Sequence, residues 1–495
     1  MVWETLQAAL EIVLTVEAVF ALFGGVIIGT LIGAIPGMTV TMGVALTLPF
    51  TFAMHPAVGI LLLLGVYKGG VYGGSITAIL IKTPGTPAAS CTVLDGYPMS
   101  QNGEARKALD MALYASCFAD FISNISLILF AGVLASFALR FGPPEYFTLI
   151  VFSLTIIAGI AGDNMAKGMV SAGIGLLLAT MGLDLVYGTN RFVFGEVELM
   201  AGLNFIPVLI GLFALPEIIN FYAKRFEARG DIQALAGGHA TFAEFRRCFK
   251  SIFRGSVIGV VLGAIPGIGG APSAFLSYSE AQRTSKNPEN FGNGEIEGVA
   301  ASEAGNNGTC GATLIPLLAL GVPGDIVTAV ILGAFMIHGL QPGPLLFEDN
   351  LDLIYSLFIG IMISSVFLFI VGKSAIRLFS RVALLPNQIL FPIVLVLCVY
   401  GGYAVNNNLF DILVMMLIGL LGFAMLRGNI PAAPFLIAYV LGPLLEDNFR
   451  QSLLLSHGGL EIFVRNEICW IFWALTVLAV VLIVRRQRRW PRDME

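Results

Sequence analysis

The side chains that could do chemistry in this chain lie beside segments rich in glycine and proline. The pentapeptide Gly-Ala-Ile-Pro-Gly occurs at residues 33–37 and again at residues 263–267. Each copy is followed by a polar segment of small residues and an apolar run that ends in Pro-Gly, within residues 68–87 and 306–326. Glycine and proline interrupt helices and leave backbone amides and carbonyls without partners. Freed amides bind carboxylates and freed carbonyls bind small cations, so the repeated pattern favours an ion-binding site.

The same small residues also allow two helices to pack closely, which is a second interpretation. Residues 69–75, Gly-Gly-Val-Tyr-Gly-Gly-Ser, could form such a packing surface. A single hydroxyl group often bonds back to its own helix as well. Both motifs recur in the same order, near half the chain apart, and this favours ion binding over packing. We therefore expect an interrupted helix at each motif in both halves.

Ionisable residues inside apolar segments are costly in lipid and therefore indicate function. Lys68 and Lys82 flank the first small-residue segment, where a lysine could pair with an anionic substrate or extend to the membrane surface. Asp120 and Asn124 are one helical turn apart, and we expect them to share a face. Asp325 follows Pro-Gly directly, and we expect it to cap the next helix.

Polar residues also gather beside the second motif. Glu303, Asn306 and Asn307 approach the second polar segment, where they suit a hydrated anion, a cation or a proton relay. A hydroxyl group can donate to a carboxylate or offer its oxygen to sodium. The hydroxyl groups near the motifs are those of Thr39, Thr41, Ser75, Thr77, Thr83, Thr86, Ser273, Thr309 and Thr313.

The composition excludes several classes of protein. Of 495 residues, 57% are hydrophobic and 12% are charged, about half the charged share of a soluble domain. The net charge of −5 makes nucleic acid an unlikely partner. The six cysteines form no CxxC pair and the four histidines form no HExxH motif, which disfavours disulfides and zinc. Residues 372–374, Gly-Lys-Ser, end like a nucleotide-binding loop, but Phe367 replaces its first glycine and disfavours an ATP-driven pump.

Long apolar runs place the chain in a membrane as helices. Residues 12–35, 57–81 and 353–371 are examples of such runs. A transmembrane barrel would instead alternate polar and apolar residues along short segments. We expect an all-α polytopic membrane protein with about 10–14 helical crossings, some of them broken by glycine and proline.

Basic residues suggest a division of the chain and an orientation. Seven lysines and arginines lie within residues 221–255, and five arginines lie within residues 485–495, whereas the first 67 residues contain neither. Basic residues near the ends of spans mark the cytoplasmic side. We expect a first transmembrane half at 1–220, a basic cytoplasmic connector at 221–255, a second transmembrane half at 256–484 and a basic cytoplasmic tail at 485–495. The N-terminus would then be periplasmic.

Four segments carry a resemblance to a known family. They are GAIPGMTVTMGVALTLPFTF from residue 33, YGGSITAILIKTPGTPAA from residue 72, GAIPGIGGAPSAFLSY from residue 263 and ASEAGNNGTCGATLIPLLALGVPGD from residue 301. Together they resemble the TctA family, the large membrane subunit of the tripartite tricarboxylate transporters. The similarity extends from about residue 15 to about residue 480.

The resemblance implies a multi-pass subunit of a secondary transporter in the bacterial inner membrane. Its substrates would be di- or tricarboxylates, and a gradient of Na+ or H+ would drive import. The implied partners are a TctC-like periplasmic binding protein and a TctB-like small membrane subunit. The implied fold has two inverted repeats with re-entrant helices and an elevator-like motion. An ion or anion channel is the first alternative, and a membrane-embedded enzyme is the second.

The residue patterns and the resemblance together give the expected site. No catalytic residue and no cofactor are expected. The substrate-binding residues would be Thr39, Gly70, Gly73, Gly74, Ser75, Thr83, Pro84, Gly85, Thr86, Asn306, Asn307, Gly308, Thr309, Pro323 and Gly324. A sodium ion could bind near Gly37, Thr41, Thr77, Gly267, Ser273 and Thr313.

Overall fold

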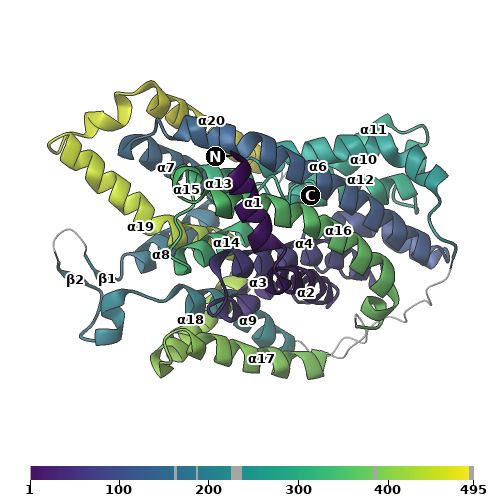
Figure 1. Ribbon diagram of the computed structural model, residues 1–495, viewed down its shortest axis with the longest axis horizontal. Coiled ribbons are helices and arrows are strands. Elements are labelled where there is room, and N and C mark those ends of the chain that lie inside the picture. Colours follow the sequence, from purple (N-terminus) through teal and green to yellow (C-terminus); the bar gives the residue numbers. More distant parts are fainter. Residues whose placement is uncertain (1, 161–163, 185–187, 224–236, 383–386, 490–495) are drawn as a thin grey trace. The chain divides into compact units, whose positions relative to one another are not determined.

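The computed structural model describes the chain except residues 1, 161–163, 185–187, 224–236, 383–386 and 490–495. The described part forms twenty α-helices and one two-stranded hairpin (Figure 1). Eight of these helices are long and apolar enough to cross a membrane, and four shorter apolar helices accompany them. The expectation of an all-α polytopic membrane protein is confirmed. The expected number of about 10–14 crossings stays a prediction, because length and composition alone identify these eight spans among the described residues.

The chain folds into two compact units, and each unit combines segments from both halves of the sequence. The first unit contains residues 1–135 and 221–397. The second unit contains residues 136–220 and 398–495. Both Gly-Ala-Ile-Pro-Gly copies and both Pro-Gly breaks belong to the first unit.

In the first unit, the N-terminal motif ends one helix and begins another. The elements from this part of the sequence are α1 (Val2–Val13), α2 (Val16–Gly33), α3 (Val40–Thr47), η1 (Leu48–Thr51), α4 (Pro56–Ile81), α5 (Ala89–Gln101) and α6 (Ala105–Ala138). Helix α2 ends within the motif at Gly33, and α3 begins after Thr39, whose side chain accepts a hydrogen bond from the Met42 amide. The expected interruption at this motif is confirmed.

The small-residue segment 69–75 does not interrupt a helix. Helix α4 runs unbroken through it, so the expectation of a break there is wrong. Glycines on α2 and α4 face each other instead: a Cβ added to Gly29 would lie 2.1 Å from the Val66 carbonyl oxygen, and one added to Gly73 would lie 2.5 Å from the Thr30 carbonyl oxygen. Close approach of the two backbones therefore explains the glycines, and the packing interpretation holds here.

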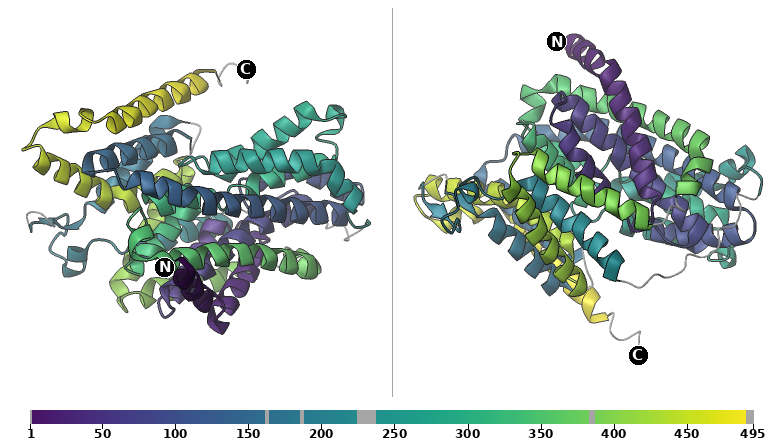
Figure 2. Two further views of the ribbon diagram at one scale, coloured as in Figure 1. Left: turned by 45° about the horizontal axis from the view of Figure 1, so that its top comes forward. Right: turned by 90° about the horizontal axis from the view of Figure 1, so that it is seen from below.

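The second half of the sequence supplies the other helices of the first unit. They are α10 (Phe242–Gly263), α11 (Gly270–Thr284), η3 (Pro288–Asn290), α12 (Ile296–Asn307), α13 (Leu314–Leu320), α14 (Ile326–Ile337), α15 (Leu346–Asp349), α16 (Leu351–Val382) and α17 (Asn387–Ala404), the last of which continues into the second unit. Helices α10, α11 and α12 lie side by side (Figures 1 and 2). Residues 242–255 of the expected basic connector form the beginning of α10, while residues 224–236 lie outside the described residues.

A serine of α6 supports the break between α12 and α13. The Ser123 hydroxyl donates to the Gly308 carbonyl at 2.6 Å and accepts from the Ala312 amide at 2.9 Å. The side chain thus replaces hydrogen bonds that an unbroken helix would make within itself. The expected interruption at the second small-residue segment is confirmed, and a residue far away in sequence stabilises it.

Replacing Ser123 with alanine should lower the free energy of unfolding by about 1–3 kcal/mol, because two buried backbone groups lose their partner. Denaturant titration of the purified chain in detergent would measure this loss. Ser126→Ala is the matched control on the same helix, because the Ser126 hydroxyl bonds back to the Ile122 carbonyl and to no other group in the described part of the chain. Equal losses in the two variants would contradict a supporting role for Ser123.

The second unit is also helical. Its elements are α7 (Pro143–Ile160), α8 (Met165–Ala179), β1 (Gly182–Leu183), β2 (Asn190–Arg191), η2 (Val197–Ala201), α9 (Phe205–Ala223), α18 (Leu409–Arg427), α19 (Ala432–Leu455), η4 (Leu460–Val464) and α20 (Glu467–Arg489). Helix α19 packs on α7 and α8 (Figure 1). Arg450 of α19 pairs with Asp184 beside the hairpin at 2.8 Å. Residues 485–489 of the expected tail continue α20, and residues 490–495 lie outside the described part.

Candidate anion-binding site

Four helices of the first unit begin at the motifs, and three of them have a side chain that accepts from their first amides. Thr39 caps α3, and Asp325 caps α14 through bonds with Thr328, as the sequence predicted for Asp325. At α5, the Thr86 hydroxyl accepts from the Ala89 amide at 3.1 Å. One amide in the first turn of each of these three helices therefore has a side-chain partner.

Helix α11 is different, because its N-cap residue is Gly269. Gly269 has a φ of +64° and no side chain to cap the helix. Gly269 occupies the place in the second motif that Thr39 occupies in the first, two residues after the pentapeptide. The Ser273 hydroxyl donates to the Gly269 carbonyl and does not cap the amides. The start of α11 thus offers the amides of Gly270 and Ala271, since Pro272 has none, and the positive end of a helix dipole, a favourable place for an anion.

Asn306 lies against this uncapped helix start. Its side chain is 2% exposed, and its Nδ2 has no partner among the described residues. A Cβ added to Gly270 would lie 2.8 Å from Asn306 Oδ1, 3.5 Å from Thr309 Oγ1 and 3.4 Å from Ala88 Cβ. An unpaired buried amide nitrogen is costly, and the side chain that carries it lies beside the helix start, which points to a ligand that would satisfy it.

This junction brings the two repeats together within one unit. Ala88 follows the Pro-Gly of the first repeat, whereas Gly270, Asn306 and Thr309 belong to the second. Ala88, Cys91, Ala274 and Ala301 are part of one buried cluster around it. The contact is long in range, since more than 180 residues separate Ala88 from Gly270.

At the breaks of the second repeat, polar groups of the protein form hydrogen bonds with one another. The Gly267 amide donates to the Gly324 carbonyl at 2.7 Å, which joins the two breaks of the second repeat. The Tyr67 hydroxyl donates to Asp325 at 2.9 Å and lies 3.2 Å from Thr313 Oγ1. These groups satisfy one another.

The first Pro-Gly break is closely packed. The Gly85 amide donates to the Gly74 carbonyl at 3.3 Å, and a Cβ on Gly85 would lie 2.0 Å from the Gly33 carbonyl oxygen. A Cβ on Gly74 would lie 2.8 Å from Thr86 Cγ2. The glycines at this break therefore serve the approach of three backbone segments.

The structure brings some of the expected substrate residues together and separates others by role. Asn306 and Thr309 gather at the start of α11. Asn307 turns instead to Ser116 and Glu303, and Gly308 supports the break with Ser123. The Thr83 hydroxyl is exposed and donates to the Ile81 carbonyl. The packing and break-forming positions are Gly70, Gly73, Gly74, Pro84, Gly85, Pro323 and Gly324, while Ser75 is buried within α4.

The expected sodium residues fall on both repeats, and their role stays a prediction. The hydroxyls of Thr77, Ser273 and Thr313 each donate to a carbonyl of their own segment, and Thr41 is buried in α3. Gly37 adopts a φ of +86° and Gly267 a φ of +87°, so the last glycine of each motif has the same left-handed φ. This likeness supports the relation between the two repeats.

Sequence reasoning missed the partner of Lys68. Lys68 neither faces a substrate nor reaches a membrane surface: its Nζ pairs with Asp120 at 2.8 Å, and both side chains are 1% exposed. The Ile361 carbonyl and Ser365 complete the cluster. Asp120 and Asn124 do share a face, as predicted. No local sequence pattern predicts the contribution of α16, because its residues lie nearly 300 positions further along the chain.

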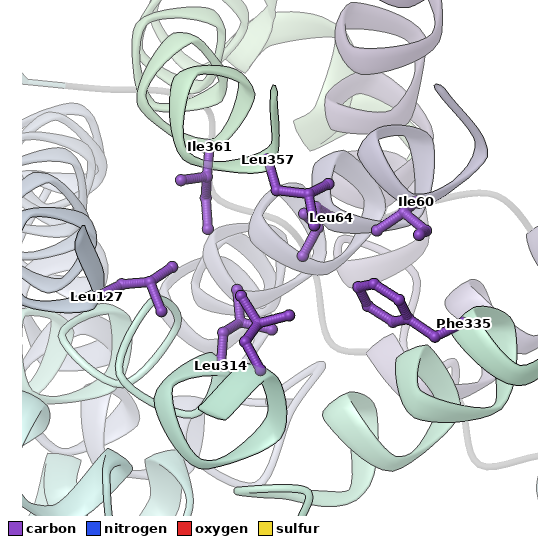
Figure 3. A pocket seen from close by; sticks show the side chains of 8 residues that line it. Ile60, Leu64, Leu127, Leu314, Phe335, Leu357 and Ile361 are labelled. Atoms are coloured by element: carbon purple, nitrogen blue, oxygen red, sulfur yellow. The ribbon is translucent and has the colours of Figure 1, made fainter. Parts of the chain in front are cut away.

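One small cavity among the described residues of this unit does not suit an anion. It measures about 10 Å³ and is lined by apolar side chains from α4, α6, α13, α14 and α16, including Leu64, Leu127 and Phe335 (Figure 3). A carboxylate would find neither room nor a hydrogen-bond donor there. The junction at α11 is therefore the better candidate site.

A multi-pass helical protein whose two repeats meet at broken helices has the architecture found in secondary transporters. The chain belongs to the tripartite tricarboxylate transporter TctA family, whose sequence profile matches residues 19–437. It is 37% identical, over 99% of its length and 97% of the relative's, to an uncharacterized 52.8 kDa protein of Agrobacterium vitis encoded in the TAR-I ttuC' 3' region.

A second protein of Agrobacterium vitis, an uncharacterized protein in the TAR-II ttuC' 3' region, is 37% identical over 48% of this chain and 97% of its own length. No solved structure matches the chain. The expected relation to the TctA family is thus confirmed by sequence.

Proposed function

We propose that this chain is the inner-membrane subunit that moves di- or tricarboxylates in a binding-protein-dependent secondary transporter. A TctC-like periplasmic protein would deliver the substrate, and a TctB-like small subunit would associate with this chain. A cation gradient, of Na+ or H+, would drive import. Membership of the TctA family supports the transporter class.

The observation that carries the site is the uncapped start of α11 beside the unpaired Asn306 amide. A substrate carboxylate would accept hydrogen bonds from the amides at the helix start and from Asn306 Nδ2. Such bonds to an ionised group are stronger than those between neutral groups. Gly270 is partly exposed, which supports access of a ligand to the junction.

The proposed transport cycle follows from the cost of moving charge through lipid. A bare carboxylate cannot be buried without a compensating charge, so one or more cations would travel with the substrate. The loaded site would then move inward against a fixed scaffold in an elevator-like motion. The basic residues of α10 and of the C-terminal region support a cytoplasmic C-terminus and a periplasmic N-terminus.

Gly270→Ala should reduce carboxylate uptake, because the new methyl group would lie 2.8 Å from Asn306 Oδ1 and fill the junction. Loss of one or two charge-assisted hydrogen bonds, worth about 1.5–3 kcal/mol each, corresponds to a rise in apparent KM of about tenfold or more. Uptake of labelled citrate, succinate and tartrate into vesicles containing the whole transporter would measure the effect.

The matched control for this experiment is Gly173→Ala in α8, where a new Cβ would meet nothing within 4 Å. Normal uptake by Gly270→Ala would remove the start of α11 from the site. Downhill flux without the binding protein would favour a channel, and formation of a product would favour an enzyme. Uptake that needs both the binding protein and an ion gradient supports the transporter.

A further inference from the structure

Glu303 stands out among the buried carboxylates of the first unit. It lies on α12 one turn before Asn306 and Asn307, and its side chain is fully buried. Among the residues that the structure describes, no lysine, arginine or histidine forms an ion pair with it. An ionised carboxylate buried without a cation is strongly unfavourable.

The other buried carboxylates of this unit have partners that stabilise a negative charge. Asp120 pairs with Lys68, and Asp110 pairs with Lys373 and lies beside His239. Asp95 accepts from the amides of Gly292, Gly294 and Glu295 and from the Tyr278 hydroxyl, which it meets at 2.8–2.9 Å. Glu303 therefore differs from them in the kind of partner that it has.

Every hydrogen-bond partner of the Glu303 carboxyl is a neutral side chain. Thr92 of α5 bonds Oε1, and Ser116 of α6 bonds Oε2 at 3.0 Å. Asn307 Nδ2 lies 3.4 Å from Oε2 and 2.8 Å from Ser116 Oγ. Hydroxyl groups can either donate to a carboxylate or accept from a carboxylic acid, so this cluster can hold both charge states.

We propose that Glu303 binds the proton that is coupled to carboxylate import. This inference rests on the proposed function and assigns its driving ion. A proton fits into the existing hydrogen bonds, whereas a metal ion would have to separate the carboxyl from Thr92 and Ser116. Protonation neutralises the Glu303 carboxylate, which lies one helical turn from Asn306. The negative charge of the substrate, bound at Asn306, is then not repelled by a second negative charge.

Among the titratable groups near α12, Glu303 is the one best suited to bind and release the coupled proton. Titratable groups on the helices around α12 include Tyr72 of α4, Cys91 and Asp95 of α5, Cys117 of α6, Cys248 of α10 and Tyr278 of α11, with Glu297 on α12 itself. Lys68 of α4 is already paired with Asp120 of α6. Tyrosine and cysteine are ordinarily neutral near pH 7. The charge of Asp95 is satisfied by backbone amides, and Glu297 accepts from Ser251 and Ser285 at the half-buried start of the helix.

Infrared difference spectroscopy of the full chain in lipid nanodiscs tests the proton site without any substrate. The parent protein should show the carbonyl band of a protonated carboxylic acid, which disappears as the pH rises. Glu303→Gln should lose this band, because the amide keeps the shape of the side chain but cannot ionise. Glu297→Gln, the matched control on the same helix, should retain it.

Three results would overturn the proton site. One is an unchanged band in Glu303→Gln, and another is loss of the band in the parent on adding sodium chloride at fixed pH, which would indicate a sodium site. Ser116→Ala covers the case in which Glu303→Gln does not fold, since removing a hydrogen-bond partner should shift the band. A band at the parent's position in Ser116→Ala is the third contrary result.

The coupling is tested in the vesicles used for uptake. Glu303→Gln should lose accumulation driven by a pH gradient yet retain exchange of internal for external substrate, because a neutral site can still carry the anion in both directions. Accumulation equal to that of the parent would overturn the coupling. If the parent takes up no carboxylate, the proposed function fails, while the infrared result stands by itself.

Discussion

Asp120→Ala is expected to lower the free energy of unfolding by about 3–5 kcal/mol, because it leaves the Lys68 ammonium buried without its counter-charge. The Ile361 carbonyl and the Ser365 hydroxyl would remain as neutral acceptors for Lys68 Nζ. Neither replaces the carboxylate, and the side chain is too enclosed to reach water. Denaturant titration of the purified chain in detergent, followed by circular dichroism, measures the loss.

The double variant Lys68→Met with Asp120→Leu is the control for this experiment. It removes both charges, so it should recover most of the stability that Asp120→Ala loses. A buried pair commonly costs nearly as much to desolvate as its attraction returns. If Asp120→Ala unfolds at the same denaturant concentration as the parent, the pair does not neutralise Lys68 within the folded protein.

Gly29→Ala is expected to destabilise the first unit by about 3 kcal/mol, because its Cβ would lie 2.1 Å from the Val66 carbonyl oxygen. The obstacle is backbone, which cannot rotate away as a side chain can. Helices α2 and α4 would have to separate along a seam that several other glycines share. The same denaturant titration measures the effect.

Gly24→Ala provides a matched control on the same helix. A Cβ at Gly24 would meet nothing within 4 Å, and alanine is a better helix former than glycine by about 1 kcal/mol. This control should therefore be neutral or slightly stabilising. Equal destabilisation by the two variants would contradict contact with α4 as the cause of the loss, because Gly24 makes no such contact.

Local signals in the sequence predicted the positions of several breaks and caps. Helix α2 ends at Gly33, and α10 ends at Gly263, each at the first residue of its Gly-Ala-Ile-Pro-Gly motif. Asp325 caps α14. These features depend on φ preferences, missing amides and short side chains, all of which are properties of adjacent residues.

The sequence could not decide whether a run of glycines bends a helix or packs it. Residues 69–75 and residues 308–313 look alike in composition, yet α4 continues through the first and the α12–α13 break occupies the second. The first segment packs against the backbone of α2. This close approach requires a straight helix whose residues carry no side chains at the contact. The second meets Ser123, which replaces the helix's own hydrogen bonds.

The sequence alone determined that this is a multi-pass helical membrane protein with two related halves, because apolar runs, glycine and proline act through their immediate neighbours. Only the tertiary structure decided what each buried polar group meets. Lys68 pairs with Asp120 and bonds Ser365, Glu303 bonds Thr92 and Ser116, and Asn306 lies against the start of α11. These partners come from helices up to about 300 residues apart, and a buried polar group is satisfied by whichever helix the fold brings to it.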